Sequence, residues 1–148
     1  FMAWYAPEPV RIVTVEQDAR RIAEARKNFA AAGRQKQITL LEGDAAEILP
    51  GLSGPFDMIF MDAAKGQYPF LLPQAKRLMA QGGLLITDNV LQEGDILESR
   101  FAVRRRDRTI HKRMREYLYT LAHDEDLVCT VLPVGDGLAV CTVKRKDG

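Results

Sequence analysis

FDMIFMDAAKGQY, residues 56–68, has the pattern of a buried strand that ends abruptly in charged and small residues. The apolar run at 58–61 is typical of a strand covered on both faces. Asp62 follows it at once, and Lys65 comes three residues later. In open α/β sheets, ligands bind beyond the carboxyl ends of the strands. The stretch therefore predicts an α/β sheet with functional groups at this strand end.

A second segment, residues 83–89, repeats the design: the apolar run GLLIT is followed by Asp88 and Asn89. If the two strands are neighbours, Asp62 and the Asp88–Asn89 pair converge across one inter-strand spacing of about 4.8 Å. Two carboxylates and an amide oxygen are hard ligands, which suit Mg²⁺ or Ca²⁺ rather than zinc. The sequence therefore predicts a site for a hard divalent cation.

The segments on either side extend this pattern to the whole chain, which we interpret as one domain, residues 1–148. Apolar and turn-forming residues predict further strands at 10–15, 37–41, 127–132 and 138–143, with helices at 18–32, 45–49 and 69–79. We expect residues 92–99 to form a loop and 100–122 a long basic helix. Strand and helix alternate until about residue 90, and a strand pair then closes the chain. This order predicts a doubly wound sheet with an antiparallel edge.

Acidic residues also follow the two earlier predicted strands. Glu16 ends the first, where an acid commonly accepts the ribose hydroxyls of a nucleoside cofactor. Asp44 follows the second, where it could bind an adenine amine or simply cap the short helix that begins at Ala45. The alternative for Glu16 is an ordinary surface position at a strand end. The ends of successive strands line one crevice of such a sheet. The acid at each position therefore strengthens the interpretation of the other as a cofactor-binding residue.

Other polar residues have less decisive patterns. Lys65 could act as a general base beside a metal-bound hydroxyl, or it could be a surface lysine in a turn. His111 and His123 share no ligand spacing with the acids, and we interpret both as surface residues. Tyr117 and Tyr119 are expected to pack within the basic helix. The stretch PVGDG at 133–137 is interpreted as a turn.

Charge and cysteine content narrow the class of protein. With 21 Lys and Arg against 20 Asp and Glu, the net charge is close to zero and does not indicate a nucleic-acid-binding protein. Basic residues nevertheless gather at 104–115, either as a phosphate-binding surface or as a solvated helix face. Cys129 and Cys141 are expected to be buried free thiols in a reducing compartment. No apolar run is long enough to span a membrane and no signal-peptide pattern is present, so we expect a cytoplasmic protein.

Four segments together resemble the Mg²⁺-dependent O-methyltransferases, the family of the catechol and caffeoyl-CoA enzymes. They are VTVEQD, EGDA, DMIFMDAAKGQY and LLITDNVL, in this order. The resemblance implies a Rossmann-like class I methyltransferase sheet with an antiparallel C-terminal strand pair. The tail PVGDGLAVCTVK, with the basic segment before it, is most similar to the bacterial branch. That branch includes tRNA 5-hydroxyuridine methyltransferases.

The resemblance also implies roles for individual residues. Asp62, Asp88 and Asn89 would hold Mg²⁺. Lys65 would be the catalytic base, and Asp62 would be a second catalytic residue. Four residues would bind the cofactor S-adenosylmethionine: Glu16 at the ribose, Asp44 and Ala45 at the adenine, and Asp62 beside the methionine part. If tRNA is the substrate, the phosphates would contact Arg104, Arg105, Arg106, Lys112 and Arg113. A small catechol-like phenol is the alternative acceptor.

The chain departs from the family pattern at its N-terminus. The family places a first strand and a glycine-rich cofactor loop before the point that corresponds to Phe1. That strand lies between the strands at 10–15 and 56–61, so we expect an incomplete, N-terminally truncated domain with unpaired strand edges that favour a homodimer. Two other functional classes stay open. One is a nicotinamide dehydrogenase, which would leave Asp62, Asp88 and Asn89 without a role. The other is a non-catalytic binding or dimerisation module.

Overall fold

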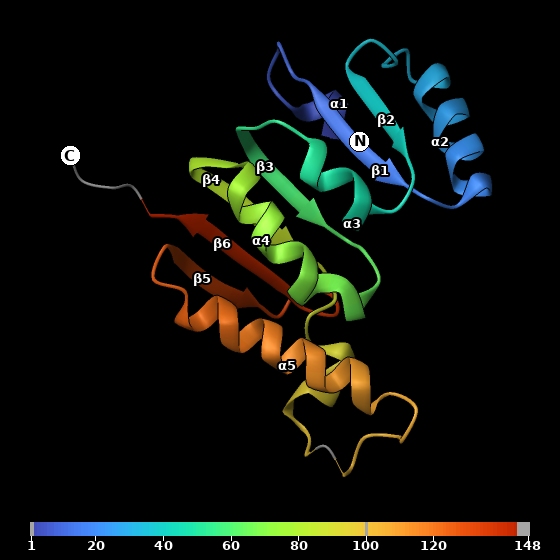
Figure 1. Ribbon diagram of the computed structural model, residues 1–148. Helices are drawn as coiled ribbons and strands as arrows, with labels where there is room; N and C mark the ends of the chain where they lie inside the picture. The colour runs from blue at the N-terminus through green and yellow to red at the C-terminus, as the bar shows by residue number, and fades with distance from the viewer. Residues whose placement is uncertain (1, 100, 145–148) are drawn as a thin grey trace. The chain divides into compact units, whose positions relative to one another are not determined.

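Strand and helix alternate along the chain in the order that the sequence predicts (Figure 1). The structure, a computed structural model, describes residues 2–99 and 101–144. The chain forms two compact units, Phe1–Leu52 and Ser53–Gly148. Among the described residues no hydrogen-bonded strand pair joins the sheet of one unit to the sheet of the other.

The first unit is built on a parallel strand pair in which Ile12 lies opposite Ile38 and Glu16 opposite Glu42. Asp18 caps the helix between these strands, because its Oδ1 accepts hydrogen bonds from two backbone amides of the first turn. The elements are α1 (Met2–Tyr5), β1 (Ile12–Glu16), α2 (Ala19–Ala31), β2 (Ile38–Glu42), α3 (Ala45–Ile48) and the 3₁₀ turn η1 (Leu49–Gly51).

The second unit contains a four-stranded sheet in the order β3-β4-β6-β5. The pair β3–β4 is parallel, whereas β4–β6 and β5–β6 are antiparallel. The predicted α/β sheet with an antiparallel C-terminal strand pair is therefore confirmed. The elements are β3 (Phe56–Met61), η2 (Lys65–Gln67), α4 (Tyr68–Leu78), β4 (Met79–Thr87), η3 (Gln92–Leu97), α5 (Arg108–His123), β5 (Leu127–Leu132) and β6 (Leu138–Val143).

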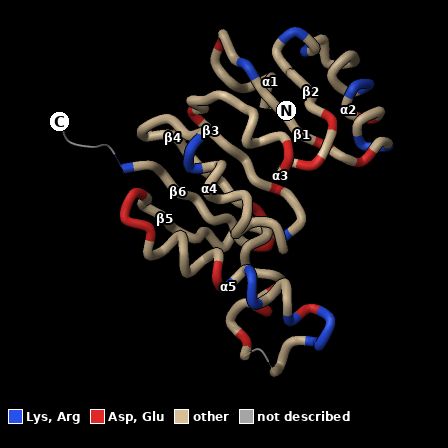
Figure 2. The backbone as a smooth tube through the Cα atoms, viewed as in Figure 1, with Lys and Arg blue, Asp and Glu red and all other residues tan. Residues whose placement is uncertain are grey.

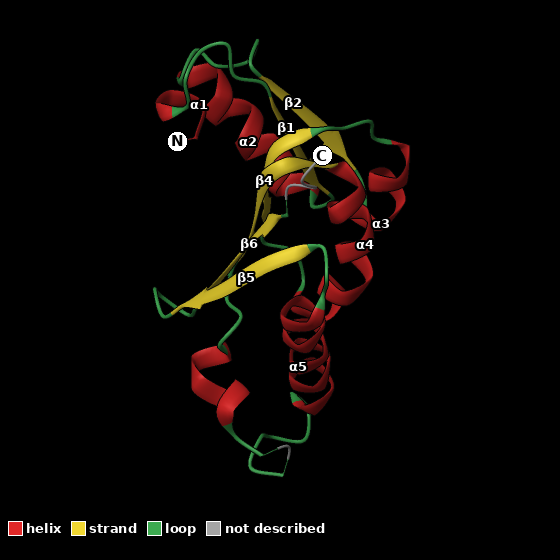
Figure 3. Cartoon of the chain, turned by 90° about the vertical axis from the view of Figure 1, so that its left-hand side faces the viewer, coloured by secondary structure: helices red, strands yellow, loops and turns green. Residues whose placement is uncertain are grey.

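The helices α4 and α5 lie on the same side of this sheet (Figure 3). Alternate strand residues point to opposite faces, so only one face of each strand packs on the helices. Met61 and Leu85 are buried on the covered face, whereas Met58 and Phe60 are each 43% exposed. The prediction that the 58–61 run is covered on both faces is therefore wrong for the described chain.

The cysteines differ from the prediction. Cys129 of β5 and Cys141 of β6 are directly opposite in the antiparallel register and form a disulfide bond. The prediction of two free thiols is thus wrong, because it treated the strands singly and ignored their pairing. The bond links neighbouring strands of one hairpin, so it fixes their register.

The segment before the basic helix also departs from expectation. Residues 92–97, labelled η3, form two short 3₁₀ turns with a kink at Glu93 and Gly94 rather than loop throughout, and α5 begins at Arg108, after turns at 101–107. The predicted start at residue 100 lies outside the described residues. In the described part of the chain, no helix combines the length and the apolar character that a membrane span requires.

The inner face of α5 carries a residue that the sequence interpretation assigned to the surface. His111 is 2% exposed and lies at helical spacing with buried Met114 and Tyr117. Its Nε2 atom has no hydrogen-bond partner among the described residues. The packing predicted for Tyr117 is confirmed, but Tyr119 is exposed and stacks on His123 with ring centroids 3.9 Å apart.

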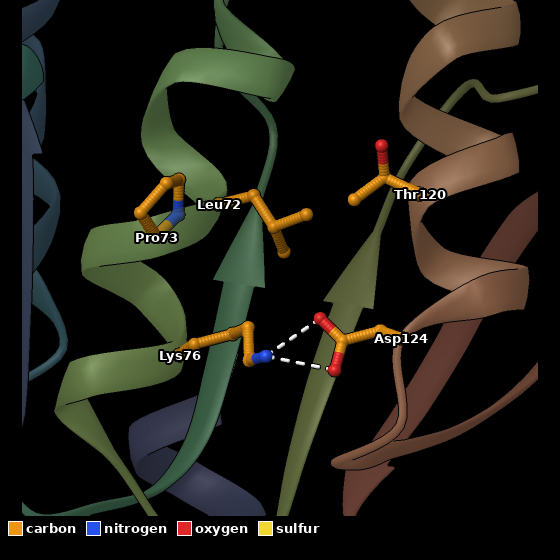
Figure 4. Close-up of a pocket in the computed structure, with 5 residues that line it drawn as sticks. All are labelled: Leu72, Pro73, Lys76, Thr120 and Asp124. Carbon is orange, nitrogen blue, oxygen red and sulfur yellow. Dashed lines mark hydrogen bonds and ion pairs between the residues drawn. The ribbon is translucent and has the colours of Figure 1, made fainter.

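A surface pocket of about 350 Å³ lies between α4 and α5 (Figure 4). An ion pair closes one end of it, with Lys76 Nζ 2.6 Å from Asp124 Oδ2 and 2.8 Å from Oδ1. The other lining residues are Leu72, Pro73 and Thr120. Burial alone would raise the pKa of Asp124, but hydrogen bonds from Lys76 and from the Asp126 amide lower the pKa below its ordinary value of 3.8.

The substitution Asp124→Asn is expected to lower the free energy of unfolding by about 1–2 kcal/mol at pH 7, because it weakens a partly buried charged hydrogen bond. A depressed carboxylate pKa stabilises the folded state above the unfolded pKa, and this contribution is lost as the pH falls through the folded pKa. The gap between wild type and variant, measured by urea denaturation, should therefore close below pH 3.8. Asp126→Asn removes a more exposed partner of the same lysine and should cost less. A gap that persists unchanged at pH 2 would contradict this assignment.

Candidate functional site

The carboxyl ends of β3 and β4 lie side by side. Met61 and Thr87 are paired in the parallel register, and the backbone amide of Asp88 donates to the Met61 carbonyl at 3.1 Å. The expectation that these strands are neighbours is confirmed. Asp62 and Asp88 are the next residues along each strand, so the structure brings the two carboxylates to one edge of the sheet.

Asp88 and Asn89 are held in a defined conformation at this edge. Asp88 Oδ1 accepts from the Asn89 amide at 2.7 Å, and Asn89 adopts a left-handed backbone with φ 55°. The hydroxyl of buried Tyr68 donates to the Asp88 carbonyl at 3.0 Å. Burial raises the pKa of Tyr68, and the negative charges of Asp62 and Asp88 raise it further. Both carboxylates therefore lie close enough to influence this hydroxyl.

The donor atoms at this edge fit a hard divalent cation. Asp62 and Asp88 offer carboxylate oxygens, and Asn89 offers an amide oxygen. No group of three or more His, Cys, Asp or Glu side chains suited to a metal occurs in the described part of the chain. A site here would thus have only two charged ligands, and bound water or substrate oxygens would complete the shell, as is usual for Mg²⁺.

Lys65 begins η2, just beyond Asp62, and its ammonium group has a specific partner. Lys65 Nζ lies 3.3 Å from Asp136 Oδ2, in the turn between β5 and β6. Sequence reasoning interpreted 133–137 only as a turn and so missed Asp136. The available signal was an acid between two glycines, Gly135 and Gly137, beside a strand that pairs with β4.

The same turn is hydrogen-bonded to the loop that follows β4. The amide of Leu91 donates to the Asp136 carbonyl at 2.9 Å, and the amide of Val90 donates to the Gly137 carbonyl at 3.1 Å. Gly137 has φ 83°, and a Cβ atom added there would lie 2.8 Å from Leu91 Cδ1 and closer still to its Cγ. Only glycine allows this close approach, so the turn and the loop are matched in shape.

The cofactor candidates Glu16, Asp44 and Ala45 belong to the first unit. The carbonyl of Glu16 accepts from the amide of Gly43 at 3.0 Å, which brings the ends of β1 and β2 together. Glu16 Oε1 accepts from the amides of Gln17 and Asp18 at 2.9 and 2.8 Å. Asp44 Oδ1 accepts from the Ala46 amide at 2.8 Å, so this residue does cap α3, whose first residue is Ala45. Both carboxylates are thereby oriented at adjacent strand ends.

Basic residues gather in the turn that precedes α5 (Figure 2). Several of them have local acidic partners. Arg104 Nε and Arg106 Nε lie 3.2 and 3.5 Å from Asp107 Oδ2, and Lys112 Nζ lies 3.5 Å from Glu116 Oε1. These side chains are nevertheless well exposed, so the pairs are weak and leave donors for another partner.

Arg113 differs from the other basic residues, because it packs inside the second unit. Its Nη1 donates to the Gly66 carbonyl at 3.3 Å, and its guanidinium lies 5.3 Å from the centroid of the Phe70 ring. This arginine therefore supports η2, the turn that carries Lys65. The exposed basic residues of the nucleic-acid prediction are Arg104, Arg105, Arg106 and Lys112.

Comparison with known proteins identifies relatives of the chain. The family described as O-methyltransferase matches residues 1–145. A catechol O-methyltransferase from Niastella koreensis is 40% identical over 102 residues, which is 66% of this chain and 46% of the relative. A second catechol O-methyltransferase, from Mycobacterium tuberculosis, is 36% identical over 59% of this chain and 40% of the relative. The chain thus spans less than half the length of these curated relatives.

A solved structure shows the same fold. The O-methyltransferase TomG from Streptomyces achromogenes, crystallised in complex with SAM, superposes with a TM-score of 0.85. It is 27% identical, and the match covers 97% of this chain and 66% of that one. The Rossmann-like fold class is therefore confirmed. With a family match across nearly all its residues, the chain belongs to the O-methyltransferase family.

Proposed function

We propose that the protein transfers a methyl group from S-adenosylmethionine to a hydroxyl oxygen with the help of Mg²⁺. The observation that carries this proposal is the placement of Asp62 and the Asp88–Asn89 pair at the ends of two hydrogen-bonded parallel strands. Lys65 is three residues from Asp62, and its Nζ atom lies 3.3 Å from Asp136 Oδ2. The Asp136 carbonyl in turn accepts a hydrogen bond from the Leu91 amide, in the loop that follows Asn89. Membership of the O-methyltransferase family supports the reaction class.

Each residue then has a role. Asp62, Asp88 and Asn89 hold the cation, while Glu16 binds the ribose and Asp44 with Ala45 borders the adenine. When bound, the cofactor supplies an electrophilic methyl group, and the cation favours the ionised form of the acceptor hydroxyl. Lys65 accepts the hydroxyl proton when its side chain is in the neutral amine form, and Asp62 aligns the reacting groups.

Calorimetric titration of S-adenosylmethionine, with and without Mg²⁺, tests this assignment. Binding that Glu16→Gln weakens, with the control Glu24→Gln unchanged, would support the proposed cofactor site. Glu24 lies exposed on α2 and has no assigned role. An absence of binding in the full-length protein would sink the methyltransferase proposal.

Two acceptors fit the site. The exposed basic residues before α5 favour 5-hydroxyuridine in tRNA, because Lys and Arg neutralise phosphates. The catechol O-methyltransferases among the relatives favour a small catechol-like phenol, which needs no basic surface. The cation-binding edge is common to both, since each acceptor presents a hydroxyl that a hard cation can bind.

Replacing Arg104, Arg105 and Arg106 by Glu distinguishes these acceptors. If tRNA is the substrate, its affinity should fall about tenfold or more, because phosphate contacts become repulsive. Filter binding and methyl transfer, each measured at two salt concentrations, would report this loss. Catechol methylation by the same variant is the internal control and should not change. Unchanged tRNA methylation in the variant would remove the RNA assignment.

A further inference from the structure

We propose that Asp136 is a positioning residue of this site, whose carboxylate holds Lys65 and the loop at 88–93 in one arrangement. The inference rests on the proposed function, because the roles of Lys65 and of the Asp88–Asn89 pair come from it. Asp136 lies far from both segments in the sequence, in the turn that joins β5 to β6. The contacts of Asp136 connect it to the site, whereas its neighbours in the sequence indicate only a turn.

The carboxylate of Asp136 binds two segments at once. Its Oδ2 atom lies 3.3 Å from Lys65 Nζ, and its Oδ1 atom accepts a hydrogen bond from the backbone amide of Glu93. The carbonyl of the same residue accepts from the Leu91 amide at 2.9 Å. The side chain of Asp136 is 20% exposed and that of Lys65 is 35% exposed, so solvent screens the pair only in part.

The loop that follows β4 requires such support, because its backbone is unusual. Asn89, Gln92 and Glu93 all have positive φ values, of 55°, 53° and 56°. Non-glycine residues rarely adopt this conformation, and it persists only where surrounding contacts hold it. Asp136 and Gly137 together supply hydrogen bonds to the loop at Val90, Leu91 and Glu93. The conformation of the predicted metal ligand Asn89 therefore depends on this turn.

Lys65 benefits in a different way. A lysine side chain has a flexible four-carbon stem, and ordering it costs conformational entropy. A fixed acceptor selects one arrangement before substrate arrives. The hydrogen bond to Asp136 thus links the two halves of the site, because the carboxylate that orients the amine also holds the loop after Asp88.

The alternative is that Asp136 is only a turn residue, since Asp between glycines favours turns. That explanation accounts for the bonds to Leu91 and Glu93 but gives no reason for the ion pair with Lys65. The two explanations differ in what they predict for the chemical reactivity of the lysine amine. A turn residue could be replaced without changing it.

Two substitutions separate the contacts. Asp136→Asn keeps its one carbonyl oxygen for the Glu93 amide and then presents an NH₂ group, which cannot accept a hydrogen bond, to Lys65. Asp136→Ala removes both contacts. Asp95→Asn is the matched control, because it removes an acid from the neighbouring η3 without touching either contact.

The experiment measures the rate at which Lys65 is modified by a brief pulse of an amine-selective reagent, with mass-spectrometric detection. Exposed Lys112 is the internal reference. Titration with Mn²⁺, as a probe for Mg²⁺, is measured in parallel, and circular dichroism confirms that each variant is folded. We expect Asp136→Asn to speed Lys65 modification about fivefold, because a partly exposed ion pair is released. Asp136→Ala should do the same and also weaken Mn²⁺ binding about tenfold, as loss of outer support does at metal sites.

An unchanged rate of Lys65 modification in Asp136→Asn would overturn the proposal. If the unaltered protein binds Mn²⁺, an unchanged Mn²⁺ affinity in a folded Asp136→Ala variant would also overturn it. If the unaltered protein binds no Mn²⁺, the metal part of the proposed function fails. The lysine measurement then decides the role of Asp136 alone, so the two failures are distinguishable.

Discussion

Asp62→Asn in the full-length protein is expected to lower kcat/KM for methyl transfer about a thousandfold, because a charged ligand of a Lewis-acid cation is worth several kcal/mol in the transition state. The same variant should lose the stimulation by added Mg²⁺. Asp62 directly follows Met61, and the Met61 carbonyl accepts a hydrogen bond from the Asp88 amide. The substitution therefore acts at the centre of the site. Steady-state kinetics across a range of Mg²⁺ concentrations would measure both effects.

Asp57→Asn is the matched control for that prediction. Asp57 lies on the same strand, β3, and is exposed at the end away from the site. The control should retain activity within about twofold, as is usual for surface substitutions. If Asp57→Asn and Asp62→Asn reduced activity equally, the loss would reflect damage to the strand, and the metal assignment would be contradicted.

The second large effect concerns the core. Leu85→Ala is expected to reduce the free energy of unfolding by about 3 kcal/mol, because it leaves a cavity under the helices. Leu85 is fully buried in β4, where it lies opposite Ile59 of β3 and Cys141 of β6. Urea denaturation followed by circular dichroism would measure the loss.

Leu84 offers a control on the same strand. It points to the opposite face and is 40% exposed, so Leu84→Ala should cost about 1 kcal/mol or less. Equal losses in the two variants would mean that both faces of the sheet are covered in solution. That outcome would contradict the one-sided packing seen here.

The strand ends were the most predictable part of the fold. The apolar run at 58–61 and the run before Asp88 are each terminated by charge, so their type and their C-terminal boundary follow from the residues alone. The start of β4 does not, because this strand begins at Met79, which the sequence analysis placed in the preceding helix. Pairing of β3 with β4 also follows, because strands joined by one helix usually lie side by side. The positions of Asp62 and Asp88 were therefore accessible from sequence.

Other features depend on tertiary contacts that no local pattern encodes. His111 is polar, and only the docking of α5 on the sheet determines that its face is buried. The disulfide between Cys129 and Cys141 depends on hairpin register, which is fixed by the length of the turn. Asp136 was missed for the same reason, because the turn acquires its partners only when β6 pairs with β4.

The basic segment shows how propensity can mislead. A run of arginines favours helix, and the sequence interpretation extended the helix back to residue 100. The structure instead starts α5 at Arg108, and Asp107 pairs with two preceding arginines in a turn. Arg113 is drawn inward to Gly66. Of the exposed residues in the nucleic-acid prediction, Arg104, Arg105 and Arg106 thus lie in the turn, and Lys112 lies on α5.

The most direct measurement for the central claim is a Mn²⁺ titration followed by ¹H–¹⁵N NMR. Mn²⁺ substitutes for Mg²⁺ at oxygen sites, and it broadens the signals of nearby amides. We expect the amides of Asp62, Asp88 and Asn89 to broaden first, and we expect Asp62→Asn to abolish this local effect. Broadening that begins elsewhere, for example at the acidic pair Asp124 and Asp126, or that is unchanged in the variant, would contradict the assignment of a cation site to the ends of β3 and β4.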